Sequence, residues 1–218
     1  MCGRYSFAIE DELIKERFGV MVRSAIYKAR YNCAPSQELA VINNGYPDEL
    51  QFFRWGLIPF WAKDSSIGNK LINAKAETIA EKPSFRQAFK RRRCLVPADS
   101  FYEWKRDATK TPFRMLLKDR TPFSMAGIWE KWVSRDGEIV HSFSIITTEP
   151  NELMIPIHNR MPVILLPENE QRWLDEPDET LLQSFLKPYP AELMIAYPVS
   201  KLVNSPRNDT PEVITPVT

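Results

Sequence analysis

A series of short strand-like segments in the middle of the chain is the feature that most restricts its possible folds. These segments are rich in β-branched and aromatic side chains and lie at residues 94–96, 100–104, 113–117, 123–129 and 142–147. Eighteen prolines are spread over the 218 residues, which favours short elements joined by rigid turns over a bundle of long helices. We therefore predict a mostly antiparallel sheet across this region.

The flanking regions are expected to add strands and short helices to the same domain. Further strands are predicted at residues 2–7, 38–42, 49–57, 70–74 and 193–197. Helices are predicted at residues 9–18, 83–90, 168–174 and 179–186. The pattern indicates an α+β fold in one domain, with a core over residues 2–208. The polar segment 205–218 is either a surface loop lying on the domain or a frayed tail.

Charge and cysteine content exclude several classes of protein. The formal net charge is +1, so any nucleic-acid binding has to come from a local basic patch. No apolar run approaches the roughly 20 residues that span a bilayer, and residues 1–4 show no hydrophobic signal segment, so we expect a cytoplasmic protein without a membrane partner. The three cysteines lack CxxC spacing and the two histidines are far apart, which predicts free thiols and no metal or cofactor. We expect a monomer.

Cys2 follows Met1, and initiator methionine is normally removed before a small residue. Cys2 would then carry a free α-amine beside its thiol. At the ordinary α-amine pKa of about 7.8, roughly a quarter of such amines are neutral near physiological pH, against about a thousandth of lysine side chains. A neutral amine condenses with an aldehyde to an imine, and the thiol can close on that imine to give a stable thiazolidine. Alternatively, Cys2 is only a small residue that begins a strand.

Three further polar residues are candidates for proton transfer or substrate orientation. His158 interrupts an apolar run, whereas His141 lies in a charged, hairpin-like stretch; either can be purely structural. Glu103 stands among aromatics, so it is either buried with a raised pKa or directed outward on an alternating strand. Asn73 follows apolar residues and can orient a hydroxyl or carbonyl, or simply end a strand. The basic run 90–93 indicates either a phosphate contact or a solvated face.

Six ordered sequence blocks resemble the SOS response-associated peptidase (SRAP) family, which includes abasic-site processing proteins. The resemblance extends over most of the chain to about residue 208, because residues 198–200 and 203–204 are similar to the closing segment of the family. The six blocks are Met1-Cys2-Gly3-Arg4-Tyr5, Tyr31-Asn32-Cys33-Ala34-Pro35, Trp55-Gly56-Leu57-Ile58-Pro59, Ile72-Asn73-Ala74-Lys75-Ala76-Glu77-Thr78, Phe101-Tyr102-Glu103-Trp104 and His158-Asn159-Arg160-Met161-Pro162.

The resemblance implies a strongly twisted sheet bent toward a barrel and a positively lined groove for single-stranded DNA. Cys2 corresponds to the family nucleophile, and the supporting polar groups correspond to Asn73, Glu103 and His158. Arg4 and Arg160 are similar to the arginines with which the family contacts DNA. Pro35, Trp55 and Gly56 lie in blocks that shape the groove in the family. Many family members have arginine where this chain has Lys75, which keeps the charge but gives up bidentate phosphate geometry.

These inferences predict covalent capture of abasic sites in single-stranded DNA through a Cys2 thiazolidine, in the cytoplasm or on the nucleoid. Two other interpretations use the same residues. Cys2 can instead be the nucleophile of a peptidase, or of an autoprocessing hydrolase that removes only Met1, with His158 as its base. A non-enzymatic single-strand binding module would instead stack bases on Trp55, Tyr102 and Trp104.

Overall fold

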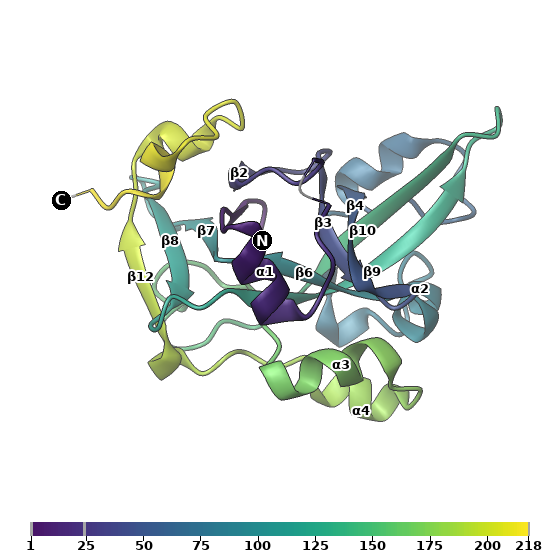
Figure 1. Cartoon of the computed structure of the whole chain (residues 1–218). Coiled ribbons are helices and arrows are strands. Elements are labelled where there is room, and N and C mark those ends of the chain that lie inside the picture. Colours follow the sequence, from purple (N-terminus) through teal and green to yellow (C-terminus); the bar gives the residue numbers. More distant parts are fainter. Residues whose placement is uncertain (1, 24, 218) are drawn as a thin grey trace.

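Two β-sheets form the framework of the computed structural model, which describes residues 2–23 and 25–217 (Figure 1). The first sheet is antiparallel throughout, in the order β12-β8-β7-β1-β2. Its strands are β1 (Tyr5–Phe7), β2 (Arg30–Cys33), β7 (Ser100–Trp104), β8 (Pro112–Leu117) and β12 (Met194–Pro198). Strand β1, just after Cys2, lies between β2 and β7 in this sheet.

The second sheet closes on itself. Its order is β11-β10-β4-β3-β6-β9, and β9 also pairs with β10, so five of its strands form a ring. The pairing of β10 with β4 is parallel, as is its pairing with the short β5 (Asn73–Lys75). The other strands are β3 (Glu38–Asn43), β4 (Tyr46–Trp55), β6 (Arg93–Ala98), β9 (Phe123–Val133), β10 (Ile139–Thr148) and β11 (Met161–Pro162). This barrel-like arrangement, with few short helices, confirms the predicted α+β class.

Short helices surround the sheets, and two of their ends lie where the sequence signals indicate. Helix α1 (Asp11–Phe18) ends at Gly19, whose φ of 67° is the left-handed conformation that glycine adopts without strain. The Asp178 side chain accepts the Thr180 N–H at the start of α4 (Glu179–Ser184). The remaining helices are α2 (Arg86–Arg91), α3 (Pro167–Asp175) and the 3-10 turns η1 (Ser65–Lys70), η2 (Ala76–Thr78), η3 (Ala191–Leu193), η4 (Lys201–Asn204) and η5 (Pro211–Ile214).

Several strand boundaries in the structure differ from the predicted ones. The strand predicted at residues 2–7 is ordered as a strand only from residue 5, and the one predicted at 70–74 is found at 73–75. The last residues of the chain, expected either on the surface or as a frayed tail, pack onto the first sheet at the left of Figure 1. There the Asp209 carboxylate accepts the backbone N–H groups of Tyr31 and Asn32, and Val213 is fully buried. The packed domain therefore extends beyond residue 208.

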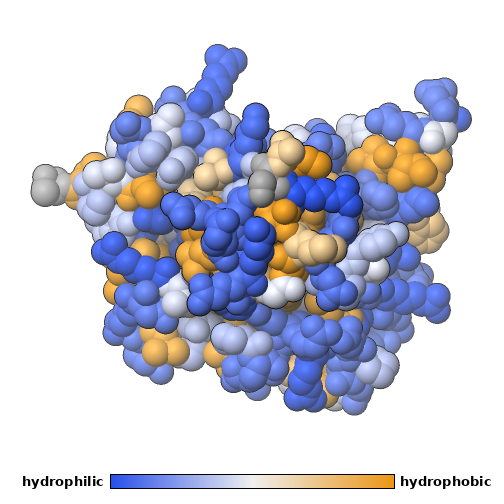
Figure 2. All heavy atoms as spheres, in the orientation of Figure 1, coloured by the Kyte–Doolittle hydropathy of each residue, from blue (hydrophilic) through white to orange (hydrophobic). Residues whose placement is uncertain are grey.

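The surface shown in Figure 2 is mostly hydrophilic, with smaller hydrophobic areas between charged side chains. Trp55 and Trp173, two of the largest buried side chains, belong to a core cluster that joins both sheets. Among the residues that the structure describes, no helix is both long and apolar enough to cross a membrane.

The basic run at residues 90–93 is used mainly within the protein. Arg93 is buried, and its guanidinium donates to backbone carbonyls at the C-terminal ends of α2 and α3, those of Phe89, Lys90, Trp173, Leu174 and Glu176. These are the carbonyls that a helix leaves without intrahelical partners. Arg92 pairs with Glu130, and Lys90 pairs with Glu179. Both interpretations of the run, a phosphate contact and a solvated face, are therefore wrong for Arg93.

Replacing Arg93 with methionine is expected to destabilise the fold by about 3 kcal/mol, because several buried carbonyls lose a charged donor. Urea unfolding followed by circular dichroism measures this change. The matched variant Arg91→Met removes an exposed arginine from the same run and should change stability by less than about 0.5 kcal/mol. Equal losses in both variants would show that Arg93 does not hold the two helix ends.

Candidate active site

Cys2 is buried in front of β1 and is held from the second sheet. The Nδ2 atom of Asn73 donates to the Cys2 carbonyl at 2.8 Å. Asn73 reaches this position because β5 runs parallel to β10, with Asn73 in register with Ile145. The Oδ1 atom of Asn73 is buried and has no hydrogen-bond partner among residues 2–23 and 25–217. A small polar group of a substrate could therefore be accepted there.

Glu103 lies on β7, next to β1 in the first sheet. The pairing of Tyr5 with Phe101 and the hydrogen bond from Tyr102 N to Arg4 O fix the position of β7 beside the residues that follow Cys2. The Glu103 side chain is only 4% exposed, so of the two predicted orientations the buried one is found. Burial raises the pKa of Glu103 to about 7. The carboxyl therefore exchanges a proton near neutral pH.

The thiol of Cys2 is protonated in this environment. Burial raises the pKa of Cys2 well above its ordinary value, and the negative charge of Glu103 raises it further. The Sγ atom donates to the backbone oxygen of Arg4 at 3.9 Å. The sulfur thus needs to transfer its proton to a base before, or as, it bonds to carbon. Glu103 is the acidic group whose charge acts on it.

His158 completes the cluster from the segment before β11. Its Nδ1 atom lies 3.8 Å from Oε1 of Glu103 and accepts the backbone N–H of Arg160 at 3.1 Å. Burial lowers the pKa of His158 below its ordinary value, so the ring is neutral near pH 7. Four residues far apart in sequence, Cys2, Asn73, Glu103 and His158, therefore meet at the junction of the two sheets. By contrast, His141 stacks on Phe53, with ring centroids 5.0 Å apart, on β10.

Arg4, predicted to contact DNA, is engaged with the C-terminal part of the chain. Its Nη1 atom donates to Asn32 Oδ1 at 3.2 Å and to Val203 O at 3.4 Å, and its Nη2 donates to Asn204 O at 3.4 Å. Its pKa is lowered by burial. These contacts fix the backbone just after Cys2, and a phosphate contact by Arg4 stays a prediction.

Arg160 and Lys75 both lie beside Thr147 of β10. Arg160 forms a two-pronged ion pair with Glu77 and also donates to the Thr147 carbonyl. Lys75 is exposed at the end of β5, two residues after Asn73. Lys75 is therefore available to a phosphate, whereas Arg160 would have to exchange or share its protein partners.

The three residues predicted to shape the groove differ in their burial and in their contacts. Pro35 is half-buried in the turn between β2 and β3. Trp55 is fully buried, and its Nε1 donates to Ile72 O at 2.9 Å, so it supports the segment before Asn73 and does not contact DNA as a surface group. Gly56 has a φ of 125°, and a Cβ there would lie 2.6 Å from the Gly68 oxygen. Only glycine fits this close approach.

Comparison with known proteins identifies the chain. Residues 1–206 match the family model described as SOS response associated peptidase (SRAP). The chain belongs to this family. Abasic site processing protein YoqW of Bacillus subtilis (strain 168) is 52% identical over 98% of this chain and 99% of its own length. Abasic site processing protein HMCES of Gallus gallus is 33% identical over 98% of this chain and 74% of its own length.

Solved structures show the same SRAP fold. A crystal structure of a protein from Bacteroides thetaiotaomicron has a TM-score of 0.91 and 35% sequence identity, with all of both chains covered. Another, from Bordetella bronchiseptica, has a TM-score of 0.82 and 27% identity, and covers 91% of this chain and 100% of its own. The two-sheet framework that joins the four polar residues is thus shared by experimentally determined structures.

Two exposed aromatics of this SRAP chain were missed in the sequence. Phe60 is 57% exposed and Trp61 48% exposed, and both line a hollow of about 510 Å³ whose other walls include Arg86, Arg91 and Arg92. The Ala62 carbonyl accepts the Trp132 Nε1–H, which fixes the adjoining backbone. Large apolar residues after a strand are ordinarily expected in the core, which is why these two were missed. The signal that could have indicated their exposure is Pro59, which places Phe60 in a turn-forming segment.

The three aromatics predicted to stack on bases do not share such a surface. Trp55 and Tyr102 are both fully buried, and the Tyr102 hydroxyl donates to Tyr31 O at 2.7 Å. Trp104 is half-buried, with its Nε1 on Asn204 Oδ1 at 2.7 Å. The binding-module interpretation that uses Trp55 and Tyr102 as stacking platforms is therefore wrong.

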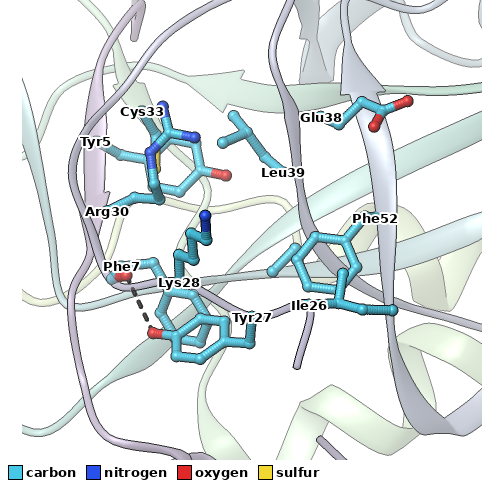
Figure 3. A pocket seen from close by; sticks show the side chains of 11 residues that line it. Tyr5, Phe7, Ile26, Tyr27, Lys28, Arg30, Cys33, Glu38, Leu39 and Phe52 are labelled. Atoms are coloured by element: carbon cyan, nitrogen blue, oxygen red, sulfur yellow. Dashed lines mark hydrogen bonds between the residues drawn. The ribbon is translucent and has the colours of Figure 1, made fainter. Parts of the chain in front are cut away.

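A separate cavity of about 190 Å³ lies between β1 and β3 and is lined by none of the four cluster residues (Figure 3). Tyr27 lines it, but its hydroxyl already donates to Phe7 O at 3.2 Å and Ile9 O at 2.8 Å. Arg30, on another wall, pairs with Asp209. The Tyr27 hydroxyl and the Arg30 guanidinium are thus already engaged by the protein itself.

Proposed function

We propose that this protein processes abasic sites in single-stranded DNA by forming a covalent thiazolidine through Cys2. The observation that carries the proposal is the position of Cys2, whose backbone is held by Asn73 while its thiol lies within the electrostatic influence of Glu103. Relatives that are 52% and 33% identical, both named abasic site processing proteins, support the choice of substrate. Met1, whose removal would expose the amine, lies outside the described residues.

The chemistry proceeds in two balanced steps. The α-amine of Cys2 condenses with the C1′ aldehyde of the ring-opened sugar, which forms a C=N bond and releases one water molecule. The Cys2 sulfur then adds to the imine carbon, so that an S–C bond forms and the thiol proton ends on nitrogen. Because the buried thiol is protonated at rest, amine attack precedes sulfur attack. Before ring closure, β-elimination through the imine would cut the strand 3′ to the site.

The supporting residues are suited to the proton movements of these steps. Glu103, with a pKa of about 7, can take a proton from the amine or the thiol and return it. In our proposal neutral His158 assists sugar-ring opening and moves protons during imine formation. The unpartnered Oδ1 of Asn73 is suited to accept a sugar hydroxyl.

Single-stranded DNA is the form that suits the exposed aromatics of this chain. Exposed Phe60 and Trp61 offer ring faces on which unpaired bases can stack, and Arg86 and Arg91 provide positive charge in the same hollow. An abasic nucleotide has no base of its own, so contacts with neighbouring bases and phosphates must position it.

Intact-mass analysis of the protein after incubation with an abasic single-stranded oligonucleotide tests the proposal. We expect one new species whose mass is that of the protein without Met1 plus the oligonucleotide, minus one water. An oligonucleotide with a tetrahydrofuran abasic analogue, which has no aldehyde, is the control and should give no adduct. Protein that retains Met1 and still forms the adduct would overturn the role of the Cys2 amine.

The family description contains the word peptidase, which corresponds to the hydrolase alternative. The intact-mass spectra also test this alternative. If the cluster removes its own Met1, protein made with His158→Gln or Glu103→Gln should retain Met1 while the wild type has lost it. If both variants lose Met1 as the wild type does, a separate aminopeptidase removes it. In that case the cluster serves the DNA reaction rather than peptide hydrolysis.

A further inference from the structure

The cations around the Cys2 cluster differ in how far the protein already uses them. Arg4 donates to a side chain and two carbonyls, and Arg160 pairs with Glu77 and a carbonyl. A phosphate would have to compete with these internal partners. Cations that are close to the cluster but have no acidic partner are therefore better suited to hold DNA next to the reacting carbon.

Arg106 is such a cation. It lies three residues after Glu103, at the start of the loop between β7 and β8, and its backbone N–H donates to Ile157 O at 3.1 Å. This bond fixes the loop against the segment that ends in His158. The Arg106 side chain is exposed, and no ion pair or side-chain hydrogen bond of its guanidinium occurs within residues 2–23 and 25–217. In the same loop, Lys105 is paired with Asp107.

The charge of Arg106 is also close enough to act on the catalytic pair. It lowers the pKa of both Glu103 and His158, as a positive charge near two titratable groups does, although burial has the larger effect on each. No other exposed arginine acts on both groups among the described residues. Together with the backbone bond to Ile157, these effects place Arg106 on the side of the cluster formed by Glu103 and His158.

We propose that Arg106 binds the DNA phosphate adjacent to the abasic nucleotide on the His158 side of the site. This inference rests on the proposed function and adds a binding residue to it. An abasic nucleotide offers only its sugar and two flanking phosphates, so a guanidinium that forms two parallel hydrogen bonds to one phosphate sets the position of the sugar. Arg106 acts from the surface without displacing any protein contact.

The salt dependence of binding tests this contact without any covalent step. An oligonucleotide with a tetrahydrofuran abasic analogue is titrated with protein at several salt concentrations. Arg106→Gln should reduce the slope of log K against log salt by roughly 0.7, the value for one single-strand phosphate contact. Arg106→Lys should keep the slope. The control Arg135→Gln removes an exposed arginine at the tip of the β9–β10 hairpin and should leave the slope unchanged.

Neutral methylphosphonates then locate the phosphate. One methylphosphonate is placed on either side of the tetrahydrofuran, and the position contacted by Arg106 should weaken wild-type binding roughly tenfold. The same substitution should have no further effect on Arg106→Gln. Equal methylphosphonate losses in wild type and variant, or an unchanged salt slope, would overturn the proposal.

The two proposals fail in distinguishable ways. If the wild type forms no adduct with an aldehyde-bearing oligonucleotide, the proposed function fails, whatever the salt slope of Arg106→Gln. If the adduct forms but Arg106→Gln changes only the pH profile of its formation and not the salt slope, Arg106 acts through the charge on Glu103 and His158, and the phosphate contact is wrong.

Discussion

Replacing Cys2 with alanine is expected to abolish the heat-stable adduct with abasic single-stranded DNA, while protein folding is retained. Alanine is also small, so Met1 should still be removed and an α-amine exposed. The amine can form an imine, but no sulfur is present to close the ring, and an imine hydrolyses on heating. Denaturing electrophoresis after heating measures the loss, with circular dichroism as the check on folding.

Two further measurements assign the separate roles of amine and thiol. A borohydride reductant should trap the Cys2→Ala imine as a stable amine, and strand cleavage 3′ to the abasic site should increase because ring closure no longer suppresses elimination. Cys33→Ala, which removes another fully buried thiol, is the matched control and should form the adduct normally. A heat-stable adduct of undiminished yield with Cys2→Ala would exclude the thiazolidine.

Local sequence patterns predicted the ends of individual elements. The end of α1 at Gly19 and the start of α4 after Asp178 depend on interactions within a few residues, so the sequence signals were sufficient. For Glu103 the sequence left two orientations open, burial or an outward direction on an alternating strand, and the structure shows the buried one, with the side chain 4% exposed. This burial raises its pKa.

Contacts between distant segments could not be predicted in this way. Asn73 reaches Cys2 only because β5 joins β10 in parallel, a register that depends on the closure of the whole second sheet. Arg93 belongs to a basic run typical of a solvated face, and its burial depends on two helix ends that approach from far along the chain. Likewise, Phe60 and Trp61 have apolar side chains, but the tertiary structure leaves both of them exposed.

Glu103 should make the fold less stable as the pH rises through the range in which the protein works. Its ordinary pKa is 4.5, and burial raises this to about 7 in the folded protein. Between these values the folded carboxyl keeps its proton while the unfolded one loses it, so the free energy of unfolding falls with rising pH. The loss is fully developed above pH 7 and reaches up to about 3 kcal/mol. In the proposed reaction, the proton exchange of Glu103 offsets this cost in stability.

Glu103→Gln is accordingly expected to gain stability relative to wild type as the pH rises from 4.5 to 8, by up to about 3 kcal/mol, because glutamine carries no titrating proton. Urea unfolding of both proteins at several pH values measures this difference. Glu77→Gln should behave oppositely, since the Arg160 hydrogen bonds lower the pKa of Glu77, and its loss should weaken the fold toward neutral pH. In crosslinking, Glu103→Gln should react more slowly and lose the inflection near pH 7, leaving only that of the α-amine. A stability difference between Glu103→Gln and wild type that stays constant from pH 4.5 to 8 would show that Glu103 ionises in the fold as it does in water.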